Sequence, residues 1–448
     1  MADNWRRLTG FALRCSGHDI PATTMRAASF SLLDTLGMTV ASAPLDAGRI
    51  ARETAHLLYG ANAPATSARM LFDGRRVSMA GAAFAAASQT DNLDGHDGYN
   101  PTKGHIGVAL VPALAAVAET VPDFSGPEAL AALVIGYEIA GRAGLALHAT
   151  VSDYHTSGAW NAIGVTALGA RLRGMGDEAL RQAMGIAEYH GPRSQMMREI
   201  ANPTMLHDGS GWGAMVGLSA VVMAEQGFTG APAVTVEADE VARHWADLGS
   251  FWQMENQYIK PYPVCRWAHG AIDAVRQICI DHDLTHDAVE GVRINSFHEA
   301  ACLYPAMPDS TSQAQYSLPF SVATMLVHGR IGVEHIAGEG LSDPVVAALL
   351  DRITVWEDER HSARFPEGRW ADVQITLKDG RRLDSGDVNA RGGPENPLAE
   401  DQIIGKFIEF AAPGVGQARA DRMVEAVLGF QKPDSRFSSL AALLYDPI

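Results

Sequence analysis

Five side chains that could move a proton or stabilise charge lie close together in the segment DNLDGHDGYNPTKGHIG (91–107). They are Asp94, His96, Asp97, Lys103 and His105. Carboxylates and imidazoles transfer protons, and an ammonium group stabilises developing negative charge. Glycines and a proline in the segment exclude a regular helix or strand, so we expect a loop between two helices. A solvated polar loop with a helix N-cap is the alternative.

A second group of reactive side chains lies in KPYPVCRWAH (260–269). Lys260 precedes two prolines that keep the backbone extended, and a helical run follows. Cys265 and His269 are four residues apart, so a helix through both would place them on one face. With Arg266, this corner offers a cation, a thiol, a guanidinium and an imidazole, which suits the binding of a carboxylate. A hinge between domains is the alternative.

Three shorter segments add candidates. DYHTSG carries His155 ahead of a helix, where a helix cap with a surface histidine is the alternative. NPTMLHDGSGW carries His207, and its glycines would leave backbone N–H groups free to bind an anion at the start of the next helix. A flexible loop is the simpler interpretation there. QAQYSLPF carries Tyr316, and a single tyrosine more often has a structural role.

Composition excludes other classes of function. The chain has 448 residues, of which 47% are hydrophobic and 19% charged, which predicts a globular protein of two or three domains. The net charge of −17 argues against nucleic acid or an anionic membrane as partner. An anionic substrate would therefore need a local concentration of cationic side chains. The four cysteines form no CxxC pair and no metal-ligand spacing, so we expect reduced thiols and no metal.

Known motifs and targeting signals are also missing from the sequence. It contains no Walker loop, no GxGxxG between a strand and a helix, no HExxH and no GxSxG. The start, MADNWRRLTGFALRC, lacks a long apolar stretch, so no signal peptide is expected. We expect no membrane helix, because no uncharged apolar span of about 18 residues occurs. These expectations favour the cytoplasm.

The elements that must position these residues are mostly helical as far as about residue 260. Small and apolar residues recur at helical spacing in the runs 25–36, 79–88, 108–118, 127–147, 159–172 and 213–227. After about residue 270 the pattern changes. VEGVRINSF (289–297) and DVQITL (372–377) alternate apolar and polar residues, as half-buried strands do. KDGRR is a turn signal, and residues 383–388 would complete a hairpin.

Further helices are expected at 318–328 and 343–352, between the strands, and at 403–410 and 418–428. The sequence therefore predicts a mainly α protein with a second, α+β domain: a large all-helical domain and a smaller lid domain. The expected boundaries are 1–268 for the first part of the helical domain, 269–398 for the lid and 399–448 for the C-terminal return to helices.

Taken together, the motifs resemble the MmgE/PrpD family, which includes 2-methylcitrate dehydratase, cis-aconitate decarboxylase and iminodisuccinate epimerase. The resemblance covers nearly the whole chain and rests on LLDTLG, DNLDGHDGYNPTKGHIGVALVPALAAVAE, IGYEIAGR, YHTSG, HDGSGWGAMVGLSAVVMAEQGFTGAPA, KPYPVCRWAH, AQYSLPFSVA and GGPENP, in that order. It implies a helical domain with an α+β domain, a homodimer, and a site between the domains that needs no metal or organic cofactor.

The resemblance also implies roles for particular residues. Asp94 and His105 match the acid and the imidazole of the family's loop. His155, Lys260 and His269 match further family positions. The chain departs from the decarboxylase pattern, which has a histidine in place of Cys265 and a lysine near the His207 segment.

The family's reactions share proton transfer at a carbon next to a carboxylate. We therefore expect a cofactor-independent lyase or isomerase that acts on a small di- or tricarboxylate, similar to 2-methylcitrate dehydratase. An epimerase of an iminodisuccinate-like acid and a non-catalytic carboxylate-binding protein are the alternatives. The expected catalytic residues are Asp94, His105, His155 and Lys260. The expected substrate-binding residues are His96, Lys103, His207, Cys265, Arg266, His269 and Tyr316.

Overall fold

The small-residue runs of the sequence form helices that pack into one helical body. The computed structural model describes residues 2–448. The helices of the body before its C-terminal part are α1 (Ala2–Thr9), α2 (Ala22–Ser42), α3 (Asp46–Leu58), α4 (Met79–Asp91), α5 (Gly107–Ala118), α6 (Gly126–Thr150), α7 (Gly158–Leu172), α8 (Asp177–His190), α9 (Met196–Ala201), α10 (Ser210–Glu225) and α11 (Val234–Glu237).

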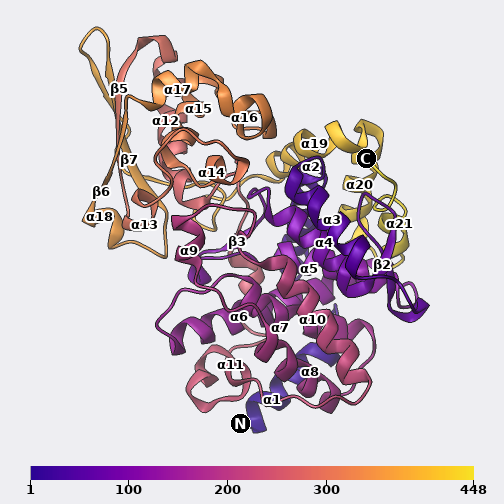
Figure 1. Ribbon diagram of the computed structural model, residues 1–448. Coiled ribbons are helices and arrows are strands. Elements are labelled where there is room, and N and C mark those ends of the chain that lie inside the picture. Colours follow the sequence, from indigo (N-terminus) through magenta and orange to yellow (C-terminus); the bar gives the residue numbers. More distant parts are fainter. Residues whose placement is uncertain (1) are drawn as a thin grey trace.

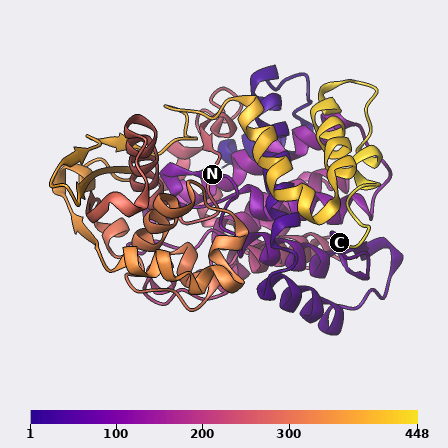
Figure 2. The ribbon, with the colours of Figure 1, turned by 90° about the horizontal axis from the view of Figure 1, so that it is seen from above.

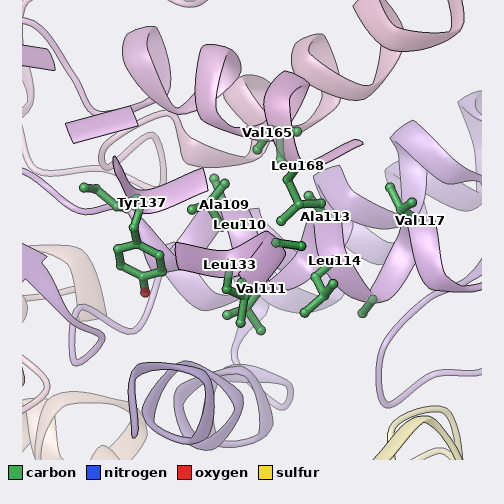
Figure 3. Packing of buried hydrophobic residues seen from close by; sticks show 14 of the residues in the cluster. Ala109, Leu110, Val111, Ala113, Leu114, Val117, Leu133, Tyr137, Val165 and Leu168 are labelled. Atoms are coloured by element: carbon green, nitrogen blue, oxygen red, sulfur yellow. The ribbon is translucent and has the colours of Figure 1, made fainter. Parts of the chain in front are cut away.

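Helices α5, α6 and α7 form the centre of the body. A Cβ at Gly164 would lie 2.7 Å from the Gly136 carbonyl oxygen and from the Ala140 side chain, so α6 and α7 touch nearly backbone to backbone. Figure 3 shows the apolar side chains that fill the space between these helices, among them Leu110, Leu114, Leu133, Val165 and Leu168. Each fully buried leucine or valine contributes about 1.5–3 kcal/mol.

Helix α6 is long and apolar enough to cross a membrane by length and composition alone. However, 94% of its most apolar window is buried within the fold. Its composition is therefore that of a central core helix.

The second part of the fold contains a five-stranded sheet. The strand order is β6-β5-β7-β8, and β9 also pairs with β7. The strands are β5 (Val289–Ser296), β6 (Ile353–Glu357), β7 (Trp370–Leu377), β8 (Arg382–Asp384) and β9 (Val388–Asn389). Strand β5 runs parallel to β6 and antiparallel to β7. Along β7 buried residues alternate with half-buried ones, as the sequence pattern predicts.

Seven helices accompany this sheet: α12 (His269–His282), α13 (His298–Ala301), α14 (Thr311–Gln315), α15 (Leu318–His328), α16 (Val333–Ile336), α17 (Pro344–Leu350) and α18 (Glu359–Ser362). Helix α12 packs against both β7 and α15. Helices make up 59% of the chain and strands 10%, which confirms the prediction of a mainly α protein with a smaller α+β part. Figure 1 shows the α+β part extending to one side of the helical body.

The expected hairpin is confirmed: β7 and β8 pair antiparallel across the Asp-Gly turn, where Gly380 has φ +88°. The expected single strand at 383–388 is wrong, because the chain bends at Gly386, with φ +62°, and continues as the short β9. The remaining strands form two small ladders. These are β1 (Ser67–Arg69) with β2 (Arg76–Ser78), and β3 (Gly98–Tyr99) with β4 (Gln257–Tyr258).

The C-terminal helices lie on the helical body. They are α19 (Glu400–Val415), α20 (Gln417–Leu428) and α21 (Phe437–Ala441). Seen from above, α19 lies toward the α+β part, where its Glu409 pairs with Arg330 at 2.5 Å, and the other two lie farther from the sheet (Figure 2). Helix α19 packs on α2, and its Lys406 ammonium pairs with Asp34 and also donates to the Gly95 carbonyl at 2.6 Å. The last helices therefore contact the loop that carries the candidate site.

Candidate active site

The 91–107 segment is a buried loop. It leaves α4 at Asp91 and joins α5 at Gly107, and every residue from 91 to 100 is buried. Its strand β3 pairs with β4, which places the loop beside the stretch that leads to Lys260. A glycine is required at position 98, because a Cβ there would collide with the Tyr258 hydroxyl. The alternative of a solvated loop is therefore wrong.

His105 is the best-defined proton acceptor of this loop. Its Nδ1 lies 2.7 Å from the Asp97 carbonyl oxygen, which can only accept a hydrogen bond. In the neutral ring Nδ1 therefore carries the hydrogen and Nε2 keeps a free lone pair. Nε2 lies 3.6 Å from Asp94 Oδ1 and 3.9 Å from Asp208 Oδ2.

Burial, with the positive charge of Lys260, lowers the pKa of His105 well below its usual value. The imidazole is therefore neutral at pH 7 and able to accept a proton.

Asp94 and Lys260 form a buried ion pair next to His105. The Lys260 ammonium is fully buried and donates to Asp94 Oδ1 and, at 2.9 Å, to the Asp94 carbonyl oxygen. Burial raises the pKa of Asp94 to about 6, although Lys260 opposes the shift. Two of the three Lys260 N–H groups are thus directed at Asp94, which leaves one for a substrate oxygen.

Two residues at the start of α7 form hydrogen bonds with the backbone of His105. Ser157 Oγ accepts a hydrogen bond from the His105 backbone N–H at 2.9 Å and donates to Asp208 Oδ1 at 2.6 Å. Asn161 Nδ2 donates to the His105 carbonyl at 3.0 Å. These bonds fix the position of the imidazole relative to the Asp208 carboxyl group.

His155 lies two residues before Ser157 in the same segment. Its backbone N–H donates to His148 Nε2 at 3.3 Å. Within residues 2–448 it has no hydrogen bond, ion pair or ring contact with Asp94 or His105. The structure thus brings Ser157 to the site, and a catalytic role for His155 stays a prediction.

Asp91 and Asp208 are buried acids of the site that the sequence interpretation missed. Asp91 Oδ2 accepts a hydrogen bond from the Ser210 N–H at 3.1 Å, so the start of α10, expected to bind an external anion, holds a carboxylate of the protein itself. Burial, and then the charge of Asp208, raises the pKa of Asp91 well above its usual value. Burial also raises the pKa of Asp208. Asp208 directly follows His207 in the segment NPTMLHDGSGW.

His96 and His105 pack edge to face, with ring centroids 4.6 Å apart. His96 Nε2 lies 3.7 Å from Asp91 Oδ1 and makes no hydrogen bond to any described residue. Burial lowers its pKa well below the usual value. His96 therefore joins the cluster as a second neutral imidazole.

His207 and Tyr316 meet at another side of the cluster. The Tyr316 hydroxyl lies 3.5 Å from His207 Nδ1, while His207 Nε2 is buried and makes no hydrogen bond within the described chain. Burial and the charge of Lys260 lower the pKa of His207 to about 3. The backbone of His207 has φ +46°, which is strained for a residue with a side chain. A cavity of about 450 Å³ between α9 and α10 reaches this histidine.

The proline corner is built differently from the expectation. Cys265 has an extended backbone, a short 3₁₀ turn η6 (Arg266–Ala268) follows, and α12 begins only at His269. The expected shared helical face of Cys265 and His269 is therefore wrong. Burial and the nearby Asp94 raise the pKa of the Cys265 thiol to about 12, so it stays protonated at neutral pH.

Arg266 and His269 bond mainly to the backbone of this corner. Arg266 Nη2 donates to the Ala390 carbonyl at 3.0 Å, and its guanidinium lies 4.5 Å from the centre of the Tyr258 ring. His269 Nε2 lies 3.0 Å from the Val264 carbonyl. These contacts stabilise the corner, and direct substrate binding by either residue stays a prediction.

One group of possible metal ligands occurs in the part of the chain that the structure describes: His361, Asp372 and Asp387, in the α+β part. Arg360 pairs with Asp372 at 2.9 Å and with Asp387 at 3.1 Å. Arg364 pairs with Asp387 at 2.7 Å. Both carboxylates are thus already paired with arginines, which makes this group an ion-pair network.

Comparison with known proteins identifies relatives over the whole fold. The chain is 23% identical over 350 residues to the cis-aconitate decarboxylase of Mus musculus, which covers 73% of this chain and 70% of the relative. It is 23% identical over 480 residues to the cis-aconitate decarboxylase-like protein oryM of Aspergillus oryzae, which covers 95% and 94%. A shorter match, 36% over 78 residues, is to the mitochondrial 2-methylcitrate dehydratase of Yarrowia lipolytica and covers 16% and 15%.

The family assignment rests on two models that match in succession. The MmgE/PrpD N-terminal domain matches residues 6–247, which form most of the helical body and include the buried loop 91–107. The MmgE/PrpD C-terminal domain matches residues 262–430, which include the whole five-stranded sheet and the helices α19 and α20. Because the two models together cover most of the chain, the protein belongs to the MmgE/PrpD family.

Proposed function

We propose that this protein is a lyase that acts on a small di- or tricarboxylate by transferring a proton at the carbon next to a carboxylate, without a metal or organic cofactor. The observation that carries the proposal is the His105 imidazole, which is neutral and presents a free Nε2 between Asp94 and Asp208. The relatives, named as decarboxylases and a dehydratase, support a lyase of small carboxylates.

In the proposed reaction His105 Nε2 takes the proton from the carbon next to the substrate carboxylate. The resulting imidazolium lies within 4 Å of two carboxyl groups, Asp94 and Asp208, which stabilise its charge. The Lys260 ammonium stabilises negative charge on the substrate through its remaining N–H group. The electron pair of the broken C–H bond then forms the carbon–carbon double bond and expels a hydroxyl group.

The leaving hydroxyl needs a proton to depart as water. Burial raises the pKa of Asp91 and of Asp208, and the charge of Asp208 adds to the shift of Asp91. Both shifts favour the protonated carboxyl group, so one of these two acids is the proposed proton donor. A base and an acid thus occur in one cluster, which favours dehydration of a hydroxy acid similar to 2-methylcitrate.

Epimerisation is the second candidate, because it needs two bases on opposite faces of one carbon. The unpartnered Nε2 of buried His207 is the observation that favours it. A homodimer in the cytoplasm completes the proposal. The exposed apolar side chains Ile50, Leu206 and Trp212, which line one small cavity beside α3 and α10, support a second copy as the partner.

Proton exchange in D₂O tests this proposal. The protein is incubated with citrate, 2-methylcitrate, cis-aconitate and iminodisuccinate, and NMR follows deuterium at the carbon next to the carboxylate. Exchange with formation of an alkene supports dehydration, exchange with inversion supports epimerisation, and loss of CO₂ indicates decarboxylation. If ligands bind but no acid in the panel exchanges or reacts, the non-catalytic alternative replaces the proposal.

A further inference from the structure

Lys103 and Arg369 lie beside the cluster without a carboxylate partner among the described residues. Lys103 Nζ makes no hydrogen bond or ion pair within residues 2–448 and lies over the Tyr154 ring, 4.5 Å from its centre. Arg369 is only 1% exposed. Its Nη1 donates to the carbonyls of Pro366 and, at 3.0 Å, Gly368. Its Nε is buried without a partner, and its Nη2 donates to no described residue.

A buried guanidinium without a counter-ion is costly unless a ligand supplies the negative charge. The two buried lysines of the site differ in this respect, because Lys260 pairs with Asp94 and Lys406 pairs with Asp34. Burial lowers the pKa of Lys103 and of Arg369, and the negative charge of Glu299 opposes both shifts. Glu299 forms no ion pair with either cation among the described residues.

The two cations come together from different parts of the fold. Lys103 belongs to the buried loop 91–107, with a left-handed backbone at φ +56°, whereas Arg369 directly precedes β7. Asn100 Nδ2 donates to the Glu367 carbonyl at 3.1 Å, which joins the loop to the turn that carries Arg369. Burial is the main cause that lowers the pKa of Lys103 and of His105, and the charge of Arg369 adds to both shifts.

We propose that Arg369 and Lys103 form the binding site for a second substrate carboxylate, remote from the carbon that loses its proton to His105. This rests on the proposed function, because it names how the far end of the same substrate is held. A guanidinium offers two parallel N–H groups to a carboxylate, and the ammonium adds a mobile positive charge. A carboxylate between them contacts both parts of the fold, so substrate binding joins the α+β part to the buried loop 91–107.

Binding of non-reacting acids tests this site without reference to turnover. Tricarballylate carries three carboxylates but neither a hydroxyl group nor a double bond, and butyrate carries one carboxylate. Isothermal titration calorimetry compares both acids on the wild type, Lys103→Gln, Arg369→Gln and Arg369→Lys. Arg382→Gln is the matched control, because Arg382 is exposed on β8 of the same sheet and forms no ion pair with a described residue.

We expect Lys103→Gln and Arg369→Gln each to weaken tricarballylate binding roughly 10- to 100-fold, as the loss of a charged hydrogen bond does. Arg369→Lys, which keeps the charge but not the two parallel N–H groups, should lie between, and Arg382→Gln should bind as the wild type does. Arg369 also donates hydrogen bonds to the carbonyls of its own turn, so circular dichroism is used to check that each variant is folded. If Arg369→Gln does not fold, the result for Lys103→Gln alone decides the test.

Unchanged tricarballylate binding in Lys103→Gln and in a folded Arg369→Gln would overturn the proposal. Equal losses of tricarballylate and butyrate binding would also overturn it, because they indicate a general structural role. The proposed function fails separately: a wild type that binds tricarballylate through these residues but exchanges no proton in D₂O keeps the binding site and loses the lyase.

Discussion

Replacing Lys260 with methionine should destabilise the protein more at high pH than at low pH. The fully buried Lys260 ammonium is the counter-ion of the Asp94 carboxylate. Methionine keeps much of the volume and removes the charge. Breaking a buried ion pair in this way costs about 3–5 kcal/mol if the remaining group stays charged. The Asp94 carboxyl group can escape this cost by taking up a proton, which makes the loss of stability depend on pH.

The pKa of Asp94 sets the size of this effect. Burial raises it to about 6 from the ordinary 3.8, even with Lys260 present. Without Lys260 it rises further, so the folded variant keeps a proton that the unfolded chain has released. Stability then falls with rising pH, by about 1.4 kcal/mol per pH unit, as long as the folded state holds that proton. In the wild type, most of this loss of stability has already occurred by pH 6, because the folded protein releases the Asp94 proton near that pH. Between pH 6 and pH 8 the variant should therefore lose about 2 kcal/mol more than the wild type.

Urea unfolding at pH 6, 7 and 8 measures the free energies. Lys378→Met is the control, because Lys378 is exposed and its loss should not change the pH dependence. The double variant Lys260→Met/Asp94→Asn removes the titrating carboxyl group, so the extra pH dependence should disappear. A destabilisation by Lys260→Met that is equal at pH 6 and pH 8 would refute the reasoning, as would a pH dependence that persists in the double variant.

Three further outcomes are expected. His105→Ala should lower kcat about 10²- to 10⁴-fold with an unchanged circular dichroism spectrum, and near-normal turnover would remove His105 from the mechanism. Asp97→Asn should flatten the pH dependence of stability: burial raises the pKa of Asp97 to about 7 from 3.8, so the wild type should lose about 2–3 kcal/mol more than the variant between pH 5 and pH 8 in urea unfolding, and equal losses would contradict this. Light scattering should show a homodimer, and a fully active monomer of 47.7 kDa would exclude it.

The sequence pattern predicted the long elements well. The run 159–172 became α7 at Gly158–Leu172, and the alternating run 372–377 became the end of β7. The burial of β7 alternates with the period of a strand, whereas α7 is buried on every side from Gly158 to Ala170, as its run of small and apolar residues predicts. Strand β6 was missed for the opposite reason. It lies at the edge of the sheet, and its five residues are half-buried or exposed, so no clear alternation marks it.

The sequence predicted which types of residue form the site better than it predicted which other residues they contact. The loop that contains Asp94 and His105 was readable, because acids, imidazoles and glycines occur together within a few residues. That Ser157 contacts the cluster, and that Asp208 faces His105, depends on how α7 and α10 start beside the loop. Arg369 stands far along the chain in no motif, and only the folded structure brings it to the loop.

The charges of the cluster explain how so many polar groups can be buried together. Burial raises the pKa of each acid and lowers the pKa of each imidazole, and both shifts favour the neutral form. The acids are Asp91, Asp94, Asp97 and Asp208, and the imidazoles are His96, His105 and His207. In the proposed dehydration, a proton taken up by His105 places a new positive charge within 4 Å of Asp94 and Asp208. That charge makes the Asp208 carboxyl group more acidic, so the uptake of one proton promotes the release of another from Asp208 to the leaving hydroxyl.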